Sequence, residues 1–450
     1  MAAPSLPPEI IAQILSYVAP ESLAPYASIN ALWQVIVERQ TFSVLNITTA
    51  GLSDLRHIIT PRRYSLVRKI YLKITLAEYS VAERVQVETD EDRSRNNQAF
   101  TETICTLFNI LSSWSTNGEY EPSIQLIISN VSPSDFTEDS NRSYRRLLGM
   151  KQPGMDILYW RYMSSYVELL KPTEELPSVG VISDLVVNRG IGRNIAPATV
   201  SKLISRLPRL RILTARLSDN ERKDEKLRDR LRNEFAISLV LWPLSLKCLY
   251  LDYPGEAPRD ADFPPLKRSK PGADAFCITF RQLSQQLKII HLDGIMVGPE
   301  LFWPQDDNKQ PYWPNLTYFH LTYAASTPSG EWLFERDPRC PEYNFDRNPE
   351  NLYMRPPMDD APQDEFPDDY RTAPSPILNR LYIAAAYAAR HMPKLETMSL
   401  VGQVQAGLNG LLGQNILQCE IKHEFYYERE QGRNIVENDS TRPNIVQNTG

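Results

Sequence analysis

Apolar residues at the start of the chain recur at helical spacing. Residues 9–18 predict an amphipathic helix of about three turns, whose apolar stripe consists of Ile10, Ile11, Ile14, Leu15 and Val18. Residues 22–27 predict a second short helix, and residues 31–37 a third that begins after Asn30. Three short helices bury too little surface to cover all of these apolar side chains among themselves. The pattern therefore predicts that another surface covers them.

After residue 50, a recurring phrase of the form apolar-x-x-apolar-x-apolar predicts a series of strands. The clearest copies begin at Leu246, Leu287, Leu316 and Leu395. Weaker copies begin at Val67, Ile182 and Leu210, and the poorest is Ile124-x-x-Ile127-x-Ser129. In each copy the last two apolar residues are expected to point into the core, because side chains alternate between the two faces of a strand.

The segments between the predicted strands contain helical patterns. Residues 97–114 place apolar side chains on one side of a helix, and residues 221–235 form a charged helix with one apolar edge. Ser375 and Pro376 are typical of a helix start, just before the Leu395 strand. Strands that alternate with helices predict an α/β or α+β chain in which each unit buries its apolar row against its neighbours.

The first helices resemble an F-box, the adaptor-binding module of the substrate receptors of cullin–RING ubiquitin ligases. The residues that carry this resemblance are Leu6-Pro7-x-Glu9-Ile10, Ile14-Leu15-x-x-Val18, Leu23, Ile29 and Trp33. The chain departs from the commonest pattern at Pro25 and at Ile29-Asn30-Ala31, where Val-Ser-Lys/Arg is usual. The resemblance implies that adaptor docking, or the helical packing behind it, uses Leu6, Pro7, Ile10, Ile14, Leu15 and Trp33. The alternative is an ordinary helical cap on a larger domain.

The recurring phrase is similar to a degenerate leucine-rich repeat, of the kind found in fungal F-box proteins. The Asn or Cys that usually follows the strand in strict repeats is missing. This resemblance implies a β/α horseshoe with long insertions, and a compact mixed α/β domain is the alternative. The predicted organisation is an F-box at 1–50, a solenoid at 51–427 with an acidic, proline-rich insertion at 326–374, and a polar tail at 428–450.

Charge and cysteine content limit the classes of partner. The net charge of −6 gives no reason to expect binding to nucleic acid or to an anionic membrane. No signal peptide or apolar run long enough to span a bilayer is visible in the sequence. Five cysteines without paired spacing suit a reducing compartment. We therefore expect an intracellular protein, in the cytoplasm, the nucleus or both.

No constellation of residues predicts catalysis. His423-Glu424 begins a zinc-protease motif, but Tyr427 stands where the second histidine is needed. Neither a glycine-rich phosphate loop nor a metal-ligand spacing of His and Cys is found. The sequence thus predicts a non-catalytic subunit without a cofactor or a metal.

If the solenoid prediction holds, the outward residues of its strands are the candidate target-binding positions. Alternation predicts one outward row of Tyr250, His291, His320 and Ser399, with Tyr318 in the parallel row. Exposed tyrosines and histidines are typical anchors of protein interfaces, although a neighbouring helix or the acidic insertion would bury them if it lay there. The resulting prediction is a substrate receptor that binds the ligase adaptor, and through it the cullin, and holds an unidentified target protein. The alternative is a scaffold with a vestigial F-box.

Overall fold

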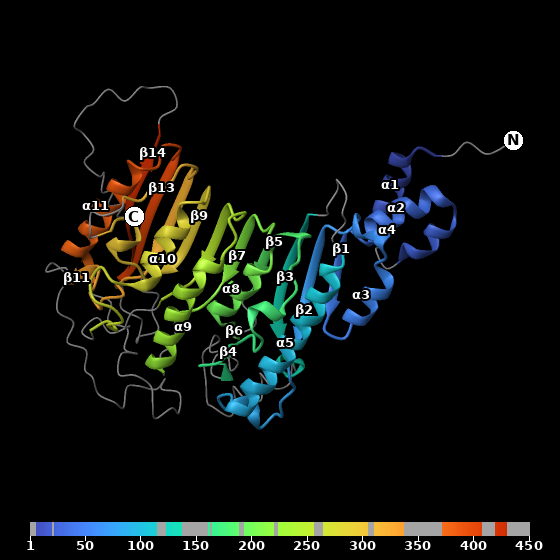
Figure 1. Cartoon of the computed structure of the whole chain (residues 1–450), viewed down its shortest axis with the longest axis horizontal. Helices are drawn as coiled ribbons and strands as arrows, with labels where there is room; N and C mark the ends of the chain where they lie inside the picture. The colour runs from blue at the N-terminus through green and yellow to red at the C-terminus, as the bar shows by residue number, and fades with distance from the viewer. Residues whose placement is uncertain are drawn as a thin grey trace.

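The computed structural model is a mixed α/β protein with one large, mostly parallel sheet (Figure 1). It describes residues 6–19, 22–114, 123–136, 161–162, 164–188, 193–219, 224–255, 264–304, 310–336, 371–406 and 419–429. Most of the predicted acidic insertion (337–370) and of the predicted tail (430–450) lies outside these residues.

Ten strands form the main sheet, and their order in space is their order in the sequence. They are β1 (Val44–Thr48), β2 (Lys69–Thr75), β3 (Ile124–Val131), β5 (Ile182–Val187), β7 (Ile212–Arg216), β8 (Cys248–Asp252), β9 (Ile289–Ile295), β10 (Tyr318–Tyr323), β13 (Thr397–Ala406) and β14 (Cys419–Glu428). All neighbours pair in parallel except β14, which runs antiparallel to β13 and ends the sheet. Each strand of the main sheet therefore lies beside the strand of that sheet that follows it in the chain.

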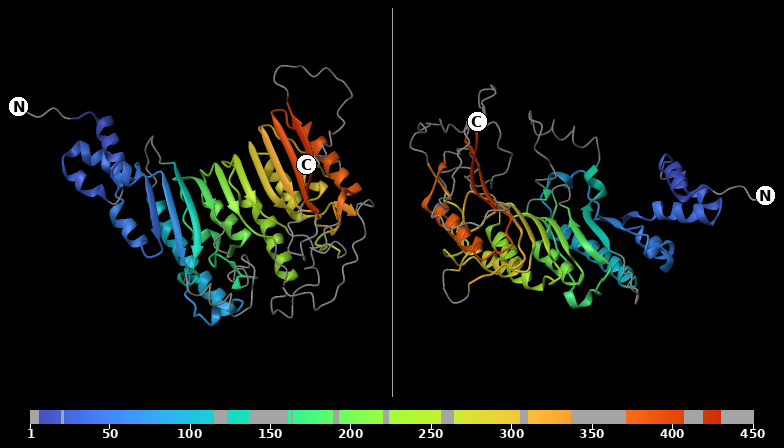
Figure 2. Two further views of the ribbon diagram at one scale, coloured as in Figure 1. Left: turned by 180° about the vertical axis from the view of Figure 1, so that it is seen from behind. Right: turned by 90° about the horizontal axis from the view of Figure 1, so that it is seen from above.

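The described helices of this part of the chain line one face of the sheet, and none of them lies on the other face (Figures 1 and 2). They are α3 (Leu52–Ile58), α4 (Pro61–Tyr64), α5 (Asp90–Ser112), α8 (Pro197–Ser205), α9 (Glu225–Ser238), α10 (Ala275–Ser284) and α11 (Pro376–Ala389). In the view from above, the sheet curves and the helices lie on its outer side (Figure 2). We call the side without helices the open face.

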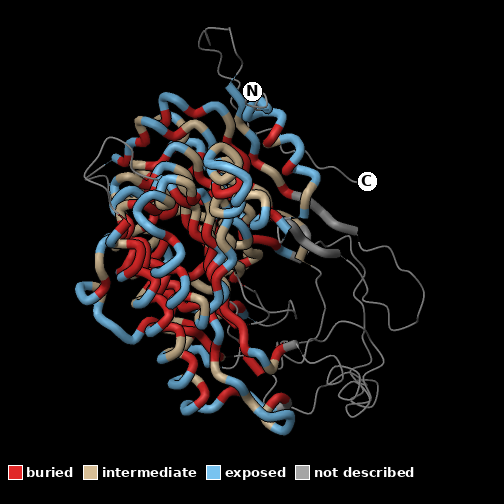
Figure 3. The backbone as a smooth tube through the Cα atoms, turned by 90° about the vertical axis from the view of Figure 1, so that its right-hand side faces the viewer, coloured by how far each residue is buried: buried red, intermediate tan, exposed pale blue. Residues whose placement is uncertain are grey.

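All eight copies of the sequence phrase coincide with strands of the sheet. Their inward residues pair in register from strand to strand, as in the row Leu249, Ile290, Phe319 and Met398. These side chains are at most 3% exposed and join the helices in one continuous core (Figure 3). Full burial of an aliphatic side chain stabilises the fold by roughly 1.5–3 kcal/mol, so the repeated row is a main source of stability.

The copy at Ile124 differs from the prediction. Leu126 and Ile128, not Ile127 and Ser129, pair with the inward residues of β2 and β5. The alternation is hidden in the sequence because the apolar residue Ile127, only 9% exposed, lies on the open face between the inward residues Leu126 and Ile128. A strand of this kind does not specify its register by pattern alone.

The helix start predicted at Ser375 is confirmed by its cap, whereas α5 begins earlier than predicted, at Asp90, and α9 begins at Glu225. The Ser375 hydroxyl accepts a hydrogen bond from the Leu378 amide with Pro376 in the first turn of α11. The helix predicted at 97–114 is the second half of α5, which begins with a capping box formed by Thr89 and Asp92. The charged helix predicted at 221–235 corresponds to α9, and its apolar edge is buried at Leu231 and Phe235.

Two small two-stranded sheets complete the described secondary structure. They pair β4 (Tyr166–Val167) with β6 (Asn194–Ile195), and β11 (Phe334–Arg336) with β12 (Arg371–Pro374). Residues 8–41 fold as a separate helical group made of α1 (Pro8–Ser16), the 3-10 helix η2 (Ala24–Ser28) and α2 (Ala31–Thr41). We call residues 6–41 the N-terminal module.

The N-terminal module projects from the β1 end of the sheet (Figures 1 and 2). Its buried residues Ile11, Leu15, Leu23 and Val37 form a core of their own, distinct from the core of the sheet. Strand β1 lies within the range 1–50 assigned to the F-box, yet it pairs with β2 as the first strand of the sheet. The helical part of the module thus ends at Thr41.

Candidate protein-binding surfaces

A side-chain cap and two first-turn prolines mark the starts of the helices in the N-terminal module. Asn30 caps α2, and its side-chain oxygen accepts hydrogen bonds from the amides of Leu32 and Trp33 at 2.9 and 3.1 Å. Pro8 occupies the first turn of α1 and Pro25 the first turn of η2, where their missing N–H groups cost nothing. Local sequence alone therefore dictates where these helices begin.

One side of α1 presents apolar side chains to solvent. Leu6, Ile10 and Ile14 are 46%, 42% and 40% exposed, and Tyr17 continues their line at 83%. Residues spaced by three or four positions share one side of a helix, so Ile10, Ile14 and Tyr17 line one side of α1. We call these three residues, together with the exposed Leu6 that precedes the helix, the α1 strip. Pro7, also exposed, stands at its beginning. The helix has more apolar surface than the module covers.

The remaining residues predicted for docking support the module from inside. Leu15 is 1% exposed and packs in the module core. Trp33 is half-buried and stacks on Tyr26, with ring centroids 6.1 Å apart. The six predicted residues thus divide into four on the surface and two that hold the helices together.

A polar contact joins the N-terminal module to the sheet. Arg63, in α4, donates a hydrogen bond to the Glu38 carboxylate of α2 at 2.8 Å, and its guanidinium lies 4.5 Å from the centre of the Phe42 ring. The hydrogen bond from Arg63 holds the pKa of Glu38 below its usual value. This contact fixes the position of α2 at the point where the chain enters β1.

The second candidate surface is the open face between β8 and β14. Tyr250 lies opposite His291, His291 opposite His320, and His320 opposite Ser399 in the strand register, which confirms the predicted row. The parallel row places Cys248, Ile289, Tyr318 and Thr397 side by side, also as predicted. Neighbouring strands lie about 4.8 Å apart, so each row is a continuous line of side chains across the sheet.

The rings of this row contact one another. His291 and His320 stack with centroids 4.5 Å apart, and Tyr250 lies 6.2 Å from His291. Burial, and then the neighbouring His291, lower the pKa of His320. Tyr250 and Tyr318 are each 37% exposed. Four of the five residues predicted for target binding therefore form a partly exposed aromatic surface.

Ser399, the fifth, differs from the others. It is only 8% exposed and donates a hydrogen bond to Glu424 of β14 at 3.0 Å. A partner bound on this face would therefore contact the Glu424 carboxylate rather than the Ser399 hydroxyl. Sequence reasoning missed β14, which adds Glu424, Tyr426 and Glu428 to the open face. The available signal was the alternation of buried His423 and Phe425 with these polar residues.

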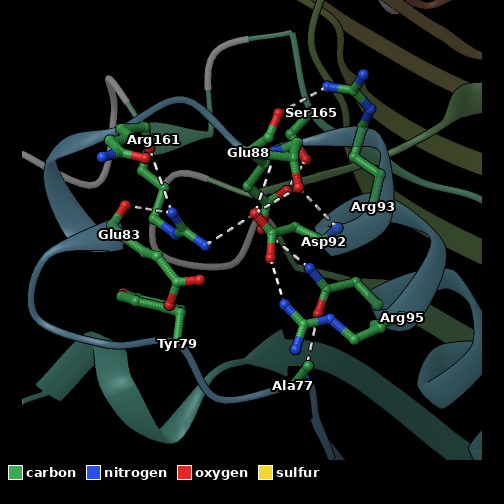
Figure 4. A network of polar contacts seen from close by, with 12 residues as sticks. Ala77, Tyr79, Glu83, Glu88, Asp92, Arg93, Arg95, Arg161 and Ser165 are labelled. Carbon is green, nitrogen blue, oxygen red and sulfur yellow. Dashed lines mark hydrogen bonds and ion pairs between the residues drawn. The ribbon is translucent and has the colours of Figure 1, made fainter.

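A buried polar network holds the loops that follow β2, β3 and β5 (Figure 4). Glu88, on the loop before α5, accepts hydrogen bonds from Asn96 at 2.9 Å and from Ser165, and pairs with Arg193. Arg161 donates to backbone carbonyls of that same loop. The network pairs its buried charges with one another and with backbone groups, which indicates a structural role. Among the described residues, the Nε atoms of Arg161 and Arg193 and the Nη1 atom of Arg193 are buried without a hydrogen-bond partner.

A second network ties α9 to α10. Arg232 of α9 pairs with Asp219 at 3.1 Å and with Asp274, the cap of α10, at 2.9 Å. Arg268 also reaches Asp219 at 2.9 Å. All four side chains are at most 5% exposed. Against the effect of burial, Arg232 lowers the pKa of Asp274. Asp219 and Asp274 are held by guanidinium groups and offer no free base.

Neither a cluster of metal-binding side chains nor a membrane-spanning helix is found among the described residues. No group of three or more His, Cys, Asp or Glu side chains in the described ranges is placed to hold a metal ion. Among the described helices, none has the length and apolarity needed to cross a membrane.

A comparison with models of protein families finds no match, and a comparison with curated protein sequences finds none either.

Proposed function

We propose that this chain is a substrate receptor of a cullin–RING ubiquitin ligase. In this proposal the N-terminal module is an F-box that binds the adaptor subunit, and the sheet and its helices form a degenerate leucine-rich-repeat solenoid that holds a target protein. The receptor contributes proximity, because it raises the local concentration of a target lysine near the ubiquitin thioester on another subunit.

The observation that carries the proposal is the α1 strip. A module that has lost its partner is expected to pack its apolar side against the rest of the chain, since exposed apolar surface favours association. Here Leu6, Ile10 and Ile14 are at least 40% exposed, and the module has its own core. The same residues carry the sequence resemblance to the F-box. Strand order and the repeated inward row support the solenoid part of the proposal.

The alternative, a scaffold outside any ligase, predicts that the adaptor does not bind. The full chain is co-expressed with the adaptor subunit, and the mixture is separated by size-exclusion chromatography. The test variant is Ile10→Asp with Ile14→Asp. The control is Ile58→Asp with Ile237→Asp, since these isoleucines are 47% and 72% exposed on α3 and α9, outside the module.

The expected result is a one-to-one complex for the natural chain and for the control, and separate peaks for the test variant. A charge in the centre of an apolar interface costs several kcal/mol, which is enough to abolish a moderate affinity. Separate peaks for the natural chain would overturn the ligase assignment and favour the scaffold. Retained binding by the test variant would show that α1 is not the docking surface.

A further inference from the structure

The open face around the aromatic row between β8 and β14 is acidic. Its outward positions are Cys248, Tyr250, Asp252, Ile289, His291, Asp293, Tyr318, His320, Thr322, Thr397, Ser399, Val401, Glu424, Tyr426 and Glu428. None of these positions carries Lys or Arg and four carry a carboxylate, while the next outward position in the register of β14 is Lys422. At the other end of the sheet the open face is basic, with Lys69 and Lys73 beside Tyr71 on β2. The face is therefore polarised along its length.

The carboxylates surround the aromatic row. Asp293 is exposed at the end of β9, two residues beyond His291. Glu424 lies at the other side of the row and is held in place by the hydroxyl of Ser399. Glu428 accepts a hydrogen bond at 3.2 Å from Tyr426, which is 53% exposed. Asp252 lies opposite Arg216 in the register, so its negative charge is partly balanced and it attracts a cation less strongly. The strongest acidic positions are those on β9 and β14.

Flat rings bordered by carboxylates suit one kind of side chain. A guanidinium stacks on an aromatic or imidazole face and forms bidentate pairs with carboxylates, whereas an ammonium group forms neither contact as well. His291 and His320 stack and cover one face of each other, which leaves one face of each ring. Tyr250 and Tyr318 beside them supply further rings. Asp293 and Glu424 supply the charge. Charge complementarity thus selects a cationic partner over an acidic one.

We propose that this part of the open face binds an extended, arginine-containing segment of the target protein, whose guanidinium groups lie over the Tyr250–His320 row and pair with Asp293 and Glu424. This inference rests on the proposed role of the sheet as a target-binding surface, but it does not depend on the adaptor. An extended segment of about eight residues reaches across the roughly 20 Å from β8 to β14.

The test measures fluorescence anisotropy of labelled peptides with the full chain at physiological ionic strength. The probes are peptides of about eight residues in which serine alternates with arginine, with lysine or with glutamate. The test variant is Asp293→Asn with Glu424→Gln. The matched control is Asp90→Asn with Glu91→Gln, which removes the same charge from the exposed first turn of α5. A second pair compares Tyr318→Leu with Tyr312→Leu, the latter 52% exposed and outside the face.

We expect the arginine peptide to bind most tightly, the lysine peptide more weakly, and the glutamate peptide not at all. The Asp293/Glu424 variant should lose about tenfold or more in affinity, and the Asp90/Glu91 control less than about twofold. Tyr318→Leu should weaken binding and Tyr312→Leu should not. Absence of arginine-peptide binding, or equal losses in test and control variants, would overturn the proposal.

The outcome is separable from that of the ligase assignment. The Ile10→Asp/Ile14→Asp variant should bind the arginine peptide as the natural chain does. Peptide binding without adaptor binding would leave the open face as a recognition surface and remove the F-box role alone. Adaptor binding without peptide binding would support the F-box role and remove the proposed arginine-binding role of the open face.

Discussion

Glu38 of α2 and Arg63 of α4 join two separately packed parts of the chain through one hydrogen bond of 2.8 Å. The Glu38 side chain is 10% exposed and that of Arg63 28%. Gln34 also donates to Glu38, at 3.3 Å. Since the module core and the sheet core are distinct, this contact determines how firmly the proposed F-box is held relative to the proposed target-binding face.

Glu38→Gln should loosen the module without unfolding the sheet. A hydrogen bond to a charged group contributes about 1.5–3 kcal/mol, and the substitution leaves the Arg63 charge without its partner. Hydrogen exchange of the α2 and β1 amides should therefore become faster, while the amides of β8–β10 stay unchanged. Glu9→Gln, on the exposed first turn of α1, is the control. Equal exchange in the two variants would contradict a role of this pair at the junction.

The same pair predicts an effect of acid. The hydrogen bond from Arg63 lowers the folded pKa of Glu38 below its usual 4.5, so the unfolded state binds the proton more tightly. The contribution to stability is then complete above about pH 4.5 and is lost as the pH falls through the lower folded pKa. In acid, exchange at the junction should approach that of Glu38→Gln. A difference between the natural chain and this variant that is independent of pH would exclude this mechanism.

Adjacent residues of α1 should differ sharply in their effect on stability. Leu15→Ala removes a side chain that is 1% exposed in a small core, and such changes cost about 2–5 kcal/mol. Ile14→Ala removes one that is 40% exposed and should stay within about 0.5 kcal/mol. Hydrogen exchange of the α1 and α2 amides measures both. A large loss of protection in Ile14→Ala would mean that the α1 strip belongs to the core.

The repeated strands could be predicted from the sequence because their signal is local. Each copy brings its two inward residues into line with those of its neighbours, so Leu249 and Leu251 predict the position of Ile290 and Leu292 without any long-range information. The row of Tyr250, His291 and His320 follows from the same alternation. The caps at Asn30 and Ser375 are equally local.

The features that the sequence did not reveal depend on contacts between distant segments. Strand β1 has only Leu45 and Ile47 as inward residues and follows directly after a helix, so it was included with the helical module. The position of Glu424 beside Ser399 requires β14 to turn back along β13. The pairing of Arg232 with Asp274 joins residues far apart in the chain, and charged residues in α9 resemble an ordinary solvated surface until the fold is known.

The Arg232 network should be among the most sensitive sites in the chain. Arg232→Met leaves Asp274 buried without its guanidinium partner, while Asp219 keeps its contact with Arg268. Loss of one member of a buried ion pair costs about 3–5 kcal/mol. Urea unfolding should show a lower midpoint. Arg230→Met, on the same helix but with a side chain 48% exposed, should change stability by about 1 kcal/mol or less. Similar midpoints for the two variants would show that Arg232 is compensated by other contacts.

Binding of the arginine peptide should weaken in mild acid. The groups that face His320 are His291 and Asp293 on β9, Ser399 on β13 and Glu424 on β14. Burial and the neighbouring His291 lower its pKa below the usual 6.5, so the imidazole is neutral at neutral pH. Protonation of His320 adds a positive charge beside the bound guanidinium groups, and the repulsion between like charges weakens their binding.

Anisotropy titrations from about pH 7.5 to about pH 5.5 measure this effect. Affinity for the arginine peptide should fall over this range, and the fall should be smaller in His320→Gln, because the substituted amide does not titrate. The natural chain should also lose stability below pH 6.5, since a histidine with a lowered folded pKa binds its proton more tightly when unfolded. An affinity that is constant with pH, or one that falls equally in His320→Gln, would show that the cation does not lie over this histidine.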